Sequence, residues 1–106
     1  MYNFDFVKPA TLDEAVAALG GEDAQPLSGG QTLLPSMKQR LNAPGVLVSL
    51  TGIAALKGVK LEGRTLVIGA ATPHAVVATE AASVYPALAA LAGGIGDPAV
   101  RNRGTI

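Results

Sequence analysis

The stretch from Ala24 to Lys38 reads AQPLSGGQTLLPSMK and carries the strongest indication of fold in the sequence. A short apolar step ends at Leu27, paired glycines follow at Gly29 and Gly30, and a helical pattern of Leu and Met begins after Thr32. Glycine adopts left-handed backbone conformations that other residues avoid, which permits a tight loop at this point. The stretch therefore predicts a strand, a tight loop and a helix in direct succession.

A second helix is predicted upstream, where residues 11–14 spell Thr-Leu-Asp-Glu. This pattern is a capping box, in which the Thr hydroxyl and the Glu carboxylate each accept a hydrogen bond from a free amide at the helix start. We expect Gly20 and Gly21 to end the helix by supplying a left-handed residue. The apolar side chains of both helices are expected to face the core. They are Leu12, Ala15, Val16 and Leu19 in the first helix and Leu33, Leu34, Met37 and Leu41 in the second.

The remaining chain predicts an alternation of short strands and helices. A buried strand is expected at residues 46–50 because of its β-branched, apolar character, and a helical turn at 51–56. Residues 59–61 and 65–68, separated by Glu-Gly-Arg, are typical of a hairpin. Thr72 followed by Pro73 predicts a helix start, and residues 86–92 predict another helix. The fold class is therefore α/β, with a small sheet and flanking helices.

Composition limits the possible functions. With 106 residues, 49% of them hydrophobic, the chain suffices for one small domain with a core. Eight basic and eight acidic residues balance without clustering, which argues against a nucleic acid partner. No apolar run approaches the roughly 18 residues that a membrane span requires, and no signal segment is evident, so we expect a cytoplasmic protein.

Metal and thiol chemistry are not indicated by this sequence. It contains no cysteine and a single histidine, His74, which is expected to be a partly exposed structural residue at a helix start. Any redox chemistry must therefore come from a bound organic cofactor, and we assign no catalytic and no metal-binding residue. The loop from Ser28 to Thr32 can cradle phosphate with its amides and hydroxyls. A Gly-Gly turn before a helix is, however, more often only a turn, and the loop matches neither the Walker A nor the Rossmann pattern.

Taken together, four segments resemble a specific family. They are Ser28-Gly29-Gly30-Gln31-Thr32-Leu33-Leu34-Pro35, Ile68-Gly69-Ala70-Ala71-Thr72, Gly96-Asp97-Pro98 and Val100-Arg101-Asn102-Arg103-Gly104-Thr105-Ile106. Their order and spacing resemble those of the FAD-binding medium subunits of molybdenum hydroxylases, including the carbon monoxide dehydrogenase and xanthine dehydrogenase flavoproteins. The resemblance covers the whole chain, and its final segment is the most specific element.

The resemblance implies a FAD-binding domain of the vanillyl-alcohol-oxidase or PCMH type, of which this chain is the N-terminal part. Residues 1–57 would form the first subdomain and 58–106 the start of the second, with Gly-containing loops holding the FAD pyrophosphate. The second family loop reads T-I-G-G, of which only Thr105 and Ile106 are present. The implied FAD-binding residues are Ser28, Gly29, Gly30, Gln31, Thr32, Leu33, Gly69, Ala70, Thr72, Asn102, Gly104, Thr105 and Ile106.

The resemblance also implies an activity. FAD in such a subunit passes electrons to an external acceptor after receiving them from iron–sulfur clusters in a small subunit, while a large subunit carries the molybdenum cofactor. The expected assembly is a hetero-oligomer, a dimer of heterotrimers. The substrate belongs to another subunit, and the isolated chain is expected to be inactive.

Two alternatives stay open. The chain could be a docking module that binds partner subunits without FAD, or a generic small α/β nucleotide-binding domain. Two further expectations concern the loops. Replacing Gly30 by Val should block FAD while leaving the fold intact, since a loop residue is changed. The tail at residues 95–106 has no apolar period, so we expect a structured loop that something outside the sequence must hold in place.

Overall fold

The computed structural model describes residues 1–106 and divides them into two compact units, Met1–Ala55 and Leu56–Ile106. The first unit contains strands β1 (Asp5–Val7), β2 (Ala24–Leu27) and β3 (Val46–Ser49) with helices α1 (Leu12–Leu19) and α2 (Leu33–Lys38). The second contains β4 (Val59–Glu62), β5 (Thr65–Ile68), α3 (His74–Glu80), α4 (Pro86–Gly93) and α5 (Pro98–Arg101). A short 3-10 helix, η1 (Ala54–Leu56), joins them. The predicted α/β class is confirmed.

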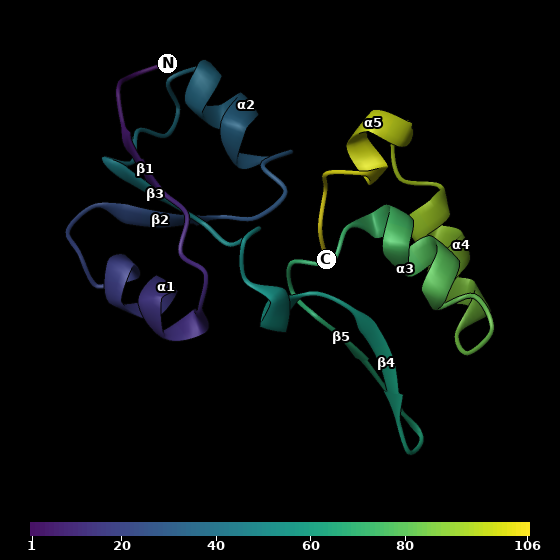
Figure 1. Ribbon diagram of the computed structural model, residues 1–106. Coiled ribbons are helices and arrows are strands. Elements are labelled where there is room, and N and C mark those ends of the chain that lie inside the picture. Colours follow the sequence, from purple (N-terminus) through teal and green to yellow (C-terminus); the bar gives the residue numbers. More distant parts are fainter. The chain divides into compact units, whose positions relative to one another are not determined.

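The sheet of the first unit has three parallel strands in the order β1-β3-β2 (Figure 1). Parallel neighbours need a crossover connection, and α1 and α2 provide the crossovers on opposite sides of the sheet. The central strand β3 is the most apolar and buries Leu47 and Val48 completely. Strand β1 was not predicted from the sequence, since it is short and fully exposed at the sheet edge.

Helix α1 begins as its capping box predicts. The Glu14 amide donates to the Thr11 hydroxyl at 3.2 Å, and the Glu14 carboxylate accepts from the Ala10 amide at 3.2 Å. The expected helix end is wrong in one respect, because Gly20 has a right-handed φ of −72°. The left-handed residue is Asp23 (φ 57°), whose carbonyl accepts from the amides of Gly45 and Val46. Asp23 thus turns the chain into β2 and ties that turn to the start of β3.

The predicted apolar faces of α1 and α2 are only partly buried. Ala15 and Met37 lie in the core, but Leu12, Val16 and Leu41 are exposed. Ala15 is the residue of α1 that is fully buried, whereas the larger side chains of Leu12 and Val16 are largely exposed. Leu41 follows the end of α2 and points away from the core. Helical periodicity alone therefore overestimated the buried surface.

Helix α2 ends in a Schellman motif that lacks the usual glycine. The Leu41 amide donates to the Ser36 carbonyl at 2.9 Å, and the Arg40 amide to the Met37 carbonyl at 3.0 Å. Arg40 adopts the left-handed conformation (φ 59°) at a cost of roughly 1–2 kcal/mol. Its guanidinium lies 4.6 Å from the centre of the Tyr2 ring, and this cation–π contact offsets part of the strain.

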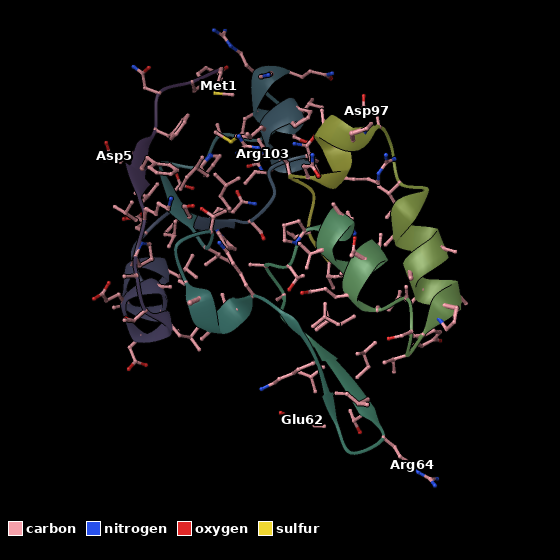
Figure 2. All side chains as sticks on the ribbon, turned by 45° about the vertical axis from the view of Figure 1, so that its right-hand side comes forward. Met1, Asp5, Glu62, Arg64, Asp97 and Arg103 are labelled. Atoms are coloured by element: carbon pink, nitrogen blue, oxygen red, sulfur yellow. The ribbon has the colours of Figure 1, made fainter.

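The second unit packs a two-stranded antiparallel hairpin against helices. The alternating side chains Val59, Leu66 and Ile68 pack on a core of Val77, Ala81, Ala89 and Ala92 from α3 and α4. The alanines allow α3 and α4 to approach closely. The hairpin tip extends beyond the helices of this unit, with Glu62 and Arg64 exposed there (Figure 2). No helix of the structure is long and apolar enough to cross a membrane.

Candidate functional site

The loop between β2 and α2 carries a run of backbone amides that have no partner within the chain. No hydrogen bond is donated by the amides of residues 29–33, although the Gly30 carbonyl accepts from the Leu34 amide at 3.1 Å. Thr32 caps α2 without using its hydroxyl, which remains available as a donor. Unsatisfied amides at the start of a helix favour an anion. This set of donors is chemically suited to the phosphate groups of a dinucleotide such as FAD.

Gly30 is required by the loop itself. Its φ is +77°, and a Cβ atom would lie 2.9 Å from Leu34 Cδ1 and 3.4 Å from Leu27 Cδ1. The space next to Gly30 is therefore filled by the protein's own side chains. Gly30→Val would strain the backbone and displace the Leu34 side chain, so we expect this substitution to lower stability as well as FAD binding.

The second predicted segment, Gly69 to Thr72, lies against residues 56–58. Its hydrogen bonds run from the Gly69 amide to the Gly58 carbonyl (2.9 Å) and from the Ala71 amide to the Leu56 carbonyl (2.9 Å). A Cβ atom at Gly69 would collide with the Leu56 carbonyl oxygen, so this glycine is needed for close backbone packing. Of this segment, Ala70 is the residue whose side chain is exposed.

Thr72 was predicted as the N-cap of the next helix, and this prediction is wrong. Pro73 is the N-cap of α3, and Thr72 is 1% exposed. Its hydroxyl accepts from the Gly58 amide at 2.9 Å and donates to the Gly58 carbonyl at 3.2 Å. The hydroxyl is thus fully used inside the protein, and its role is to fix the strand end to the preceding turn.

The predicted tail loop is partly helical. Asp97 caps α5 by accepting from the Val100 amide at 2.9 Å, and Pro98 occupies the first turn. Arg101 closes the preceding turn by donating to the carbonyls of Ile95 (3.3 Å) and Gly96 (2.8 Å). The sequence carried signals for this helix, since Asp followed by Pro is typical of a helix start. The segment is too short for periodicity to reveal it.

The end of the tail is bound to the start of α3. The His74 amide donates to the Gly104 carbonyl at 2.8 Å, and the Ile106 amide donates to the Thr72 carbonyl at 3.2 Å. An isolated bridge pairs Pro73 with Thr105. Two groups of site residues predicted separately, 69–72 and 102–106, are therefore brought side by side. The tail therefore has hydrogen bonds within the chain that its sequence pattern did not predict.

These bonds limit what the tail can offer a ligand. The Gly104 amide donates to the Val100 carbonyl at 2.7 Å, so the amides of both Gly104 and Ile106 are already used. Asn102 is exposed, and its backbone amide donates to the Pro98 carbonyl. In this segment a ligand would therefore be bound mainly by side chains, and the exposed side chain of Asn102 is the first candidate donor.

His74 is half-buried, and its Nδ1 atom is buried with no hydrogen-bond partner. Since that atom is covered by protein, it is not a contact point for a ligand. No group of three or more His, Cys, Asp or Glu side chains could hold a metal ion.

Polar groups that the sequence analysis did not single out lie at the ends of β1 and β3. Lys8 follows β1 directly, and Ser49 and Thr51 lie at the end of β3. The strand order brings them to the edge from which the loop of residues 28–32 leaves β2. Their common position depends on β1, a strand that the sequence did not reveal.

Comparison with known proteins identifies the family. Residues 2–106 match the model of the FAD binding domain in molybdopterin dehydrogenase. The chain is 44% identical to the carbon monoxide dehydrogenase medium chain of Hydrogenophaga pseudoflava, over 97% of this chain and 37% of that protein. It is 35% identical to the 6-hydroxypseudooxynicotine dehydrogenase complex subunit alpha of Paenarthrobacter nicotinovorans, over 98% of this chain and 36% of that protein.

Solved structures agree with this assignment. Carbon monoxide dehydrogenase from Hydrogenophaga pseudoflava gives a TM-score of 0.93 at 42% identity, covering 98% of this chain and 38% of the other. Quinoline 2-oxidoreductase from Pseudomonas putida 86 gives 0.94 at 34% identity with the same coverage. This chain thus spans well under half the length of its relatives. With a family model matching nearly all of its residues, the chain belongs to the family of FAD-binding domains of molybdopterin dehydrogenases.

Proposed function

We propose that this chain is the N-terminal part of the FAD-binding medium subunit of a molybdenum hydroxylase, and that its first loop binds the diphosphate of FAD. The observation that carries the proposal is the run of unpaired amides at residues 29–33 in a chain of this family. We assign the unit Met1–Ala55 to the first FAD-binding subdomain and the unit Leu56–Ile106 to the start of the second.

Different groups of the loop are proposed to donate hydrogen bonds to the diphosphate. Amides from Gly29 to Leu33 donate to the phosphate oxygens, and the Thr32 hydroxyl adds a donor. Ser28 opens the loop at the end of β2. Preformed amides need little reorganisation when an anion arrives, which favours binding. Gly69, Ala70 and Thr72, with the tail residues Asn102, Gly104, Thr105 and Ile106, form the further proposed contact region.

In that region the structure suggests distinct roles. The hydroxyl of Thr72 and the amides of Gly104 and Ile106 are engaged in internal hydrogen bonds. We assign these residues to shaping the surface that faces the cofactor, and Ala70 and Asn102 to contacting it with exposed side chains.

When bound, FAD supplies the redox chemistry, taking electrons from iron–sulfur clusters of a small partner subunit and giving them to an external acceptor. The chain itself binds and orients the cofactor, so no catalytic residue is assigned. A large subunit would carry the molybdenum cofactor and determine the substrate. The relatives act on substrates as different as carbon monoxide and quinoline according to their names. The proposed assembly is a cytoplasmic dimer of heterotrimers.

The alternative is a docking module that binds partner subunits without FAD. It is favoured by the internal use of the tail amides and by exposed apolar side chains in the first unit, among them Phe6, Leu12 and Val16. The two functions differ in flavin content but not in partner binding, so flavin content is the quantity to measure.

The test is a chimera in which this chain replaces the matching segment of the Hydrogenophaga pseudoflava carbon monoxide dehydrogenase medium chain. We expect the purified chimera to show flavin absorption bands. Thr32→Val should lower the flavin content, because it removes a hydroxyl that makes no bond within the protein.

The matched control is Thr65→Val, another exposed threonine whose loss should leave flavin content unchanged. A correctly folded chimera that assembles with its partner subunits but carries no flavin would refute FAD binding and support the docking module.

A further inference from the structure

The carboxyl edge of the three-stranded sheet gathers polar groups from every strand. Ligands of parallel α/β sheets bind outside the carboxyl ends of the strands, because the chain diverges there into loops. Here β1 is followed by Lys8, β3 by Thr51, and β2 by the loop of residues 28–32, and β3 lies between the other two strands. The Leu50 amide donates to the Leu27 carbonyl at 2.8 Å, which holds the exits of β3 and β2 together.

At the exit of β3, two hydroxyl groups are paired. Ser49 Oγ and Thr51 Oγ1 lie 3.0 Å apart, and Ser49 Oγ also accepts from the Thr51 amide at 3.5 Å. Ser49 is 3% exposed, whereas Thr51 is only half-buried. A hydroxyl has one proton to donate. If the buried Ser49 donates its proton to Thr51, no buried proton is left unpaired, and the Thr51 proton is available at the surface.

At the exit of β1, the stem of Lys8 runs alongside Gly52, the residue after Thr51. A Cβ atom at Gly52 would lie 3.2 Å from Lys8 Cε and 3.1 Å from the Pro9 carbonyl oxygen. The absence of a side chain at Gly52 therefore lets Lys8 lie close to the β3 exit. Lys8 is exposed and forms no ion pair, since the structure contains a single salt bridge, between Lys60 and Glu62.

We propose that Lys8 and Thr51 bind the same anion as the amides of the first loop, so that three strand exits form one phosphate site. Lys8 supplies a positive charge, Thr51 supplies a hydroxyl proton, and the loop supplies amides. The inference rests on the proposed function, because it assigns this anion to the diphosphate of FAD. Neither residue is among the FAD-binding residues that the resemblance implies.

The experiment is a titration of the isotope-labelled 106-residue chain, with amide chemical shifts followed by NMR. Inorganic pyrophosphate and FAD are added in separate titrations. We expect pyrophosphate to shift the amides of residues 29–33 and of Thr51 together, with a single dissociation constant. Lys8→Gln should raise that constant about three- to fivefold, the size expected for one exposed charge. Thr51→Val should raise it about tenfold or more through loss of a hydrogen bond to a charged group.

Matched variants separate this role from folding. Lys38→Gln removes an exposed cation at the far end of α2 and should leave the constant unchanged. Thr51→Ser keeps the hydroxyl and should restore binding that Thr51→Val loses. Because Thr51→Val also removes the partner of Ser49, its melting temperature is compared with that of the Ser49→Ala, Thr51→Val double variant, in which no buried hydroxyl is left unpaired.

The outcomes distinguish the inference from the function on which it rests. Shifts at residues 29–33 with FAD that are unaffected by Lys8→Gln and by Thr51→Val would overturn the inference while leaving FAD binding intact. Pyrophosphate binding that depends on Lys8 and Thr51, in a chain and chimera that take up no FAD, would support an anion site but refute its assignment to the cofactor. No shift at Thr51 with either probe would also overturn the inference.

Discussion

The loop at residues 28–33 and the tail at 102–106 both resemble FAD-binding segments of the family, yet they use their backbones in opposite ways. Amides 29–33 are unpaired within the chain. In the tail, by contrast, the amides of Gly104 and Ile106 donate to Val100 and Thr72. A shared motif therefore does not imply a shared role. The first loop is suited to donate to a phosphate, whereas the tail is suited to hold the start of α3 in place.

Gly30 in the first loop and Gly69 in the second unit are required for different reasons. Gly30 needs its left-handed φ, while Gly69 has an ordinary φ but no room for a side chain. The distinction separates a conformational requirement from a steric one. The two requirements predict losses of stability of different size.

Gly69→Ala should cause the largest loss of stability. The new Cβ atom would meet the Leu56 carbonyl, and relieving this clash requires breaking the hydrogen bonds that join Gly69 and Ala71 to residues 56–58. We expect a loss of about 3 kcal/mol or more, measured by urea unfolding. Gly93→Ala is the matched control, since its Cβ would make only an ordinary 3.7 Å contact with Ala78. Equal stability of the two variants would show that the close packing at Gly69 is not required.

Gly30→Ala should destabilise the chain by a smaller amount, about 1–2 kcal/mol, the cost of a left-handed conformation for a residue with a Cβ atom. Contact with Leu34 adds to this cost. Thermal unfolding should show a decrease of about 4–16 °C in the melting temperature. Gly21→Ala, where φ is not positive, serves as the control. An unchanged melting temperature for Gly30→Ala would indicate that the loop adopts another conformation in solution.

Hydrogen exchange should separate the two regions directly. The amides of Gly104 and Ile106 should exchange more slowly than those of Gly29 and Gln31, by a factor of about ten or more, because only the former are hydrogen-bonded in the chain. Exchange is followed residue by residue by NMR in the isolated chain. Fast exchange throughout the tail would contradict the internal anchoring and show that the tail depends on a partner.

The smallest effect is expected from FAD added to the isolated chain. Only one of the two motif regions offers unpaired backbone amides, so binding should be weak, and micromolar FAD should raise the melting temperature by no more than about 1–2 °C. A shift of several degrees would show that the first loop suffices for tight binding. The chimera, in which the remaining segments of the relative are present, should show the larger stabilisation.

Local signals in the sequence were reliable where a structure is formed by neighbouring residues. The capping box at Thr11 and Glu14 starts α1, and the Glu-Gly-Arg turn joins β4 to β5 as predicted. Sequence patterns that predict burial were less reliable, because burial depends on which other elements pack against a helix or strand. Leu12 and Val16 have the period of a buried face but lie exposed.

By itself the sequence determined the α/β class, the positions of most helices and strands, and the family, because capping, turn chemistry and ordered motifs act over short stretches of chain. Only the tertiary structure decided which donors are left for a ligand. Whether an amide or a hydroxyl is unpaired depends on groups distant in the sequence. The Thr72 hydroxyl is bonded to the Gly58 amide, and the Ile106 amide is bonded to the Thr72 carbonyl. The parallel order β1-β3-β2 likewise brings Lys8, Thr51 and the first loop to one edge, and strand order is set by packing rather than by any local pattern.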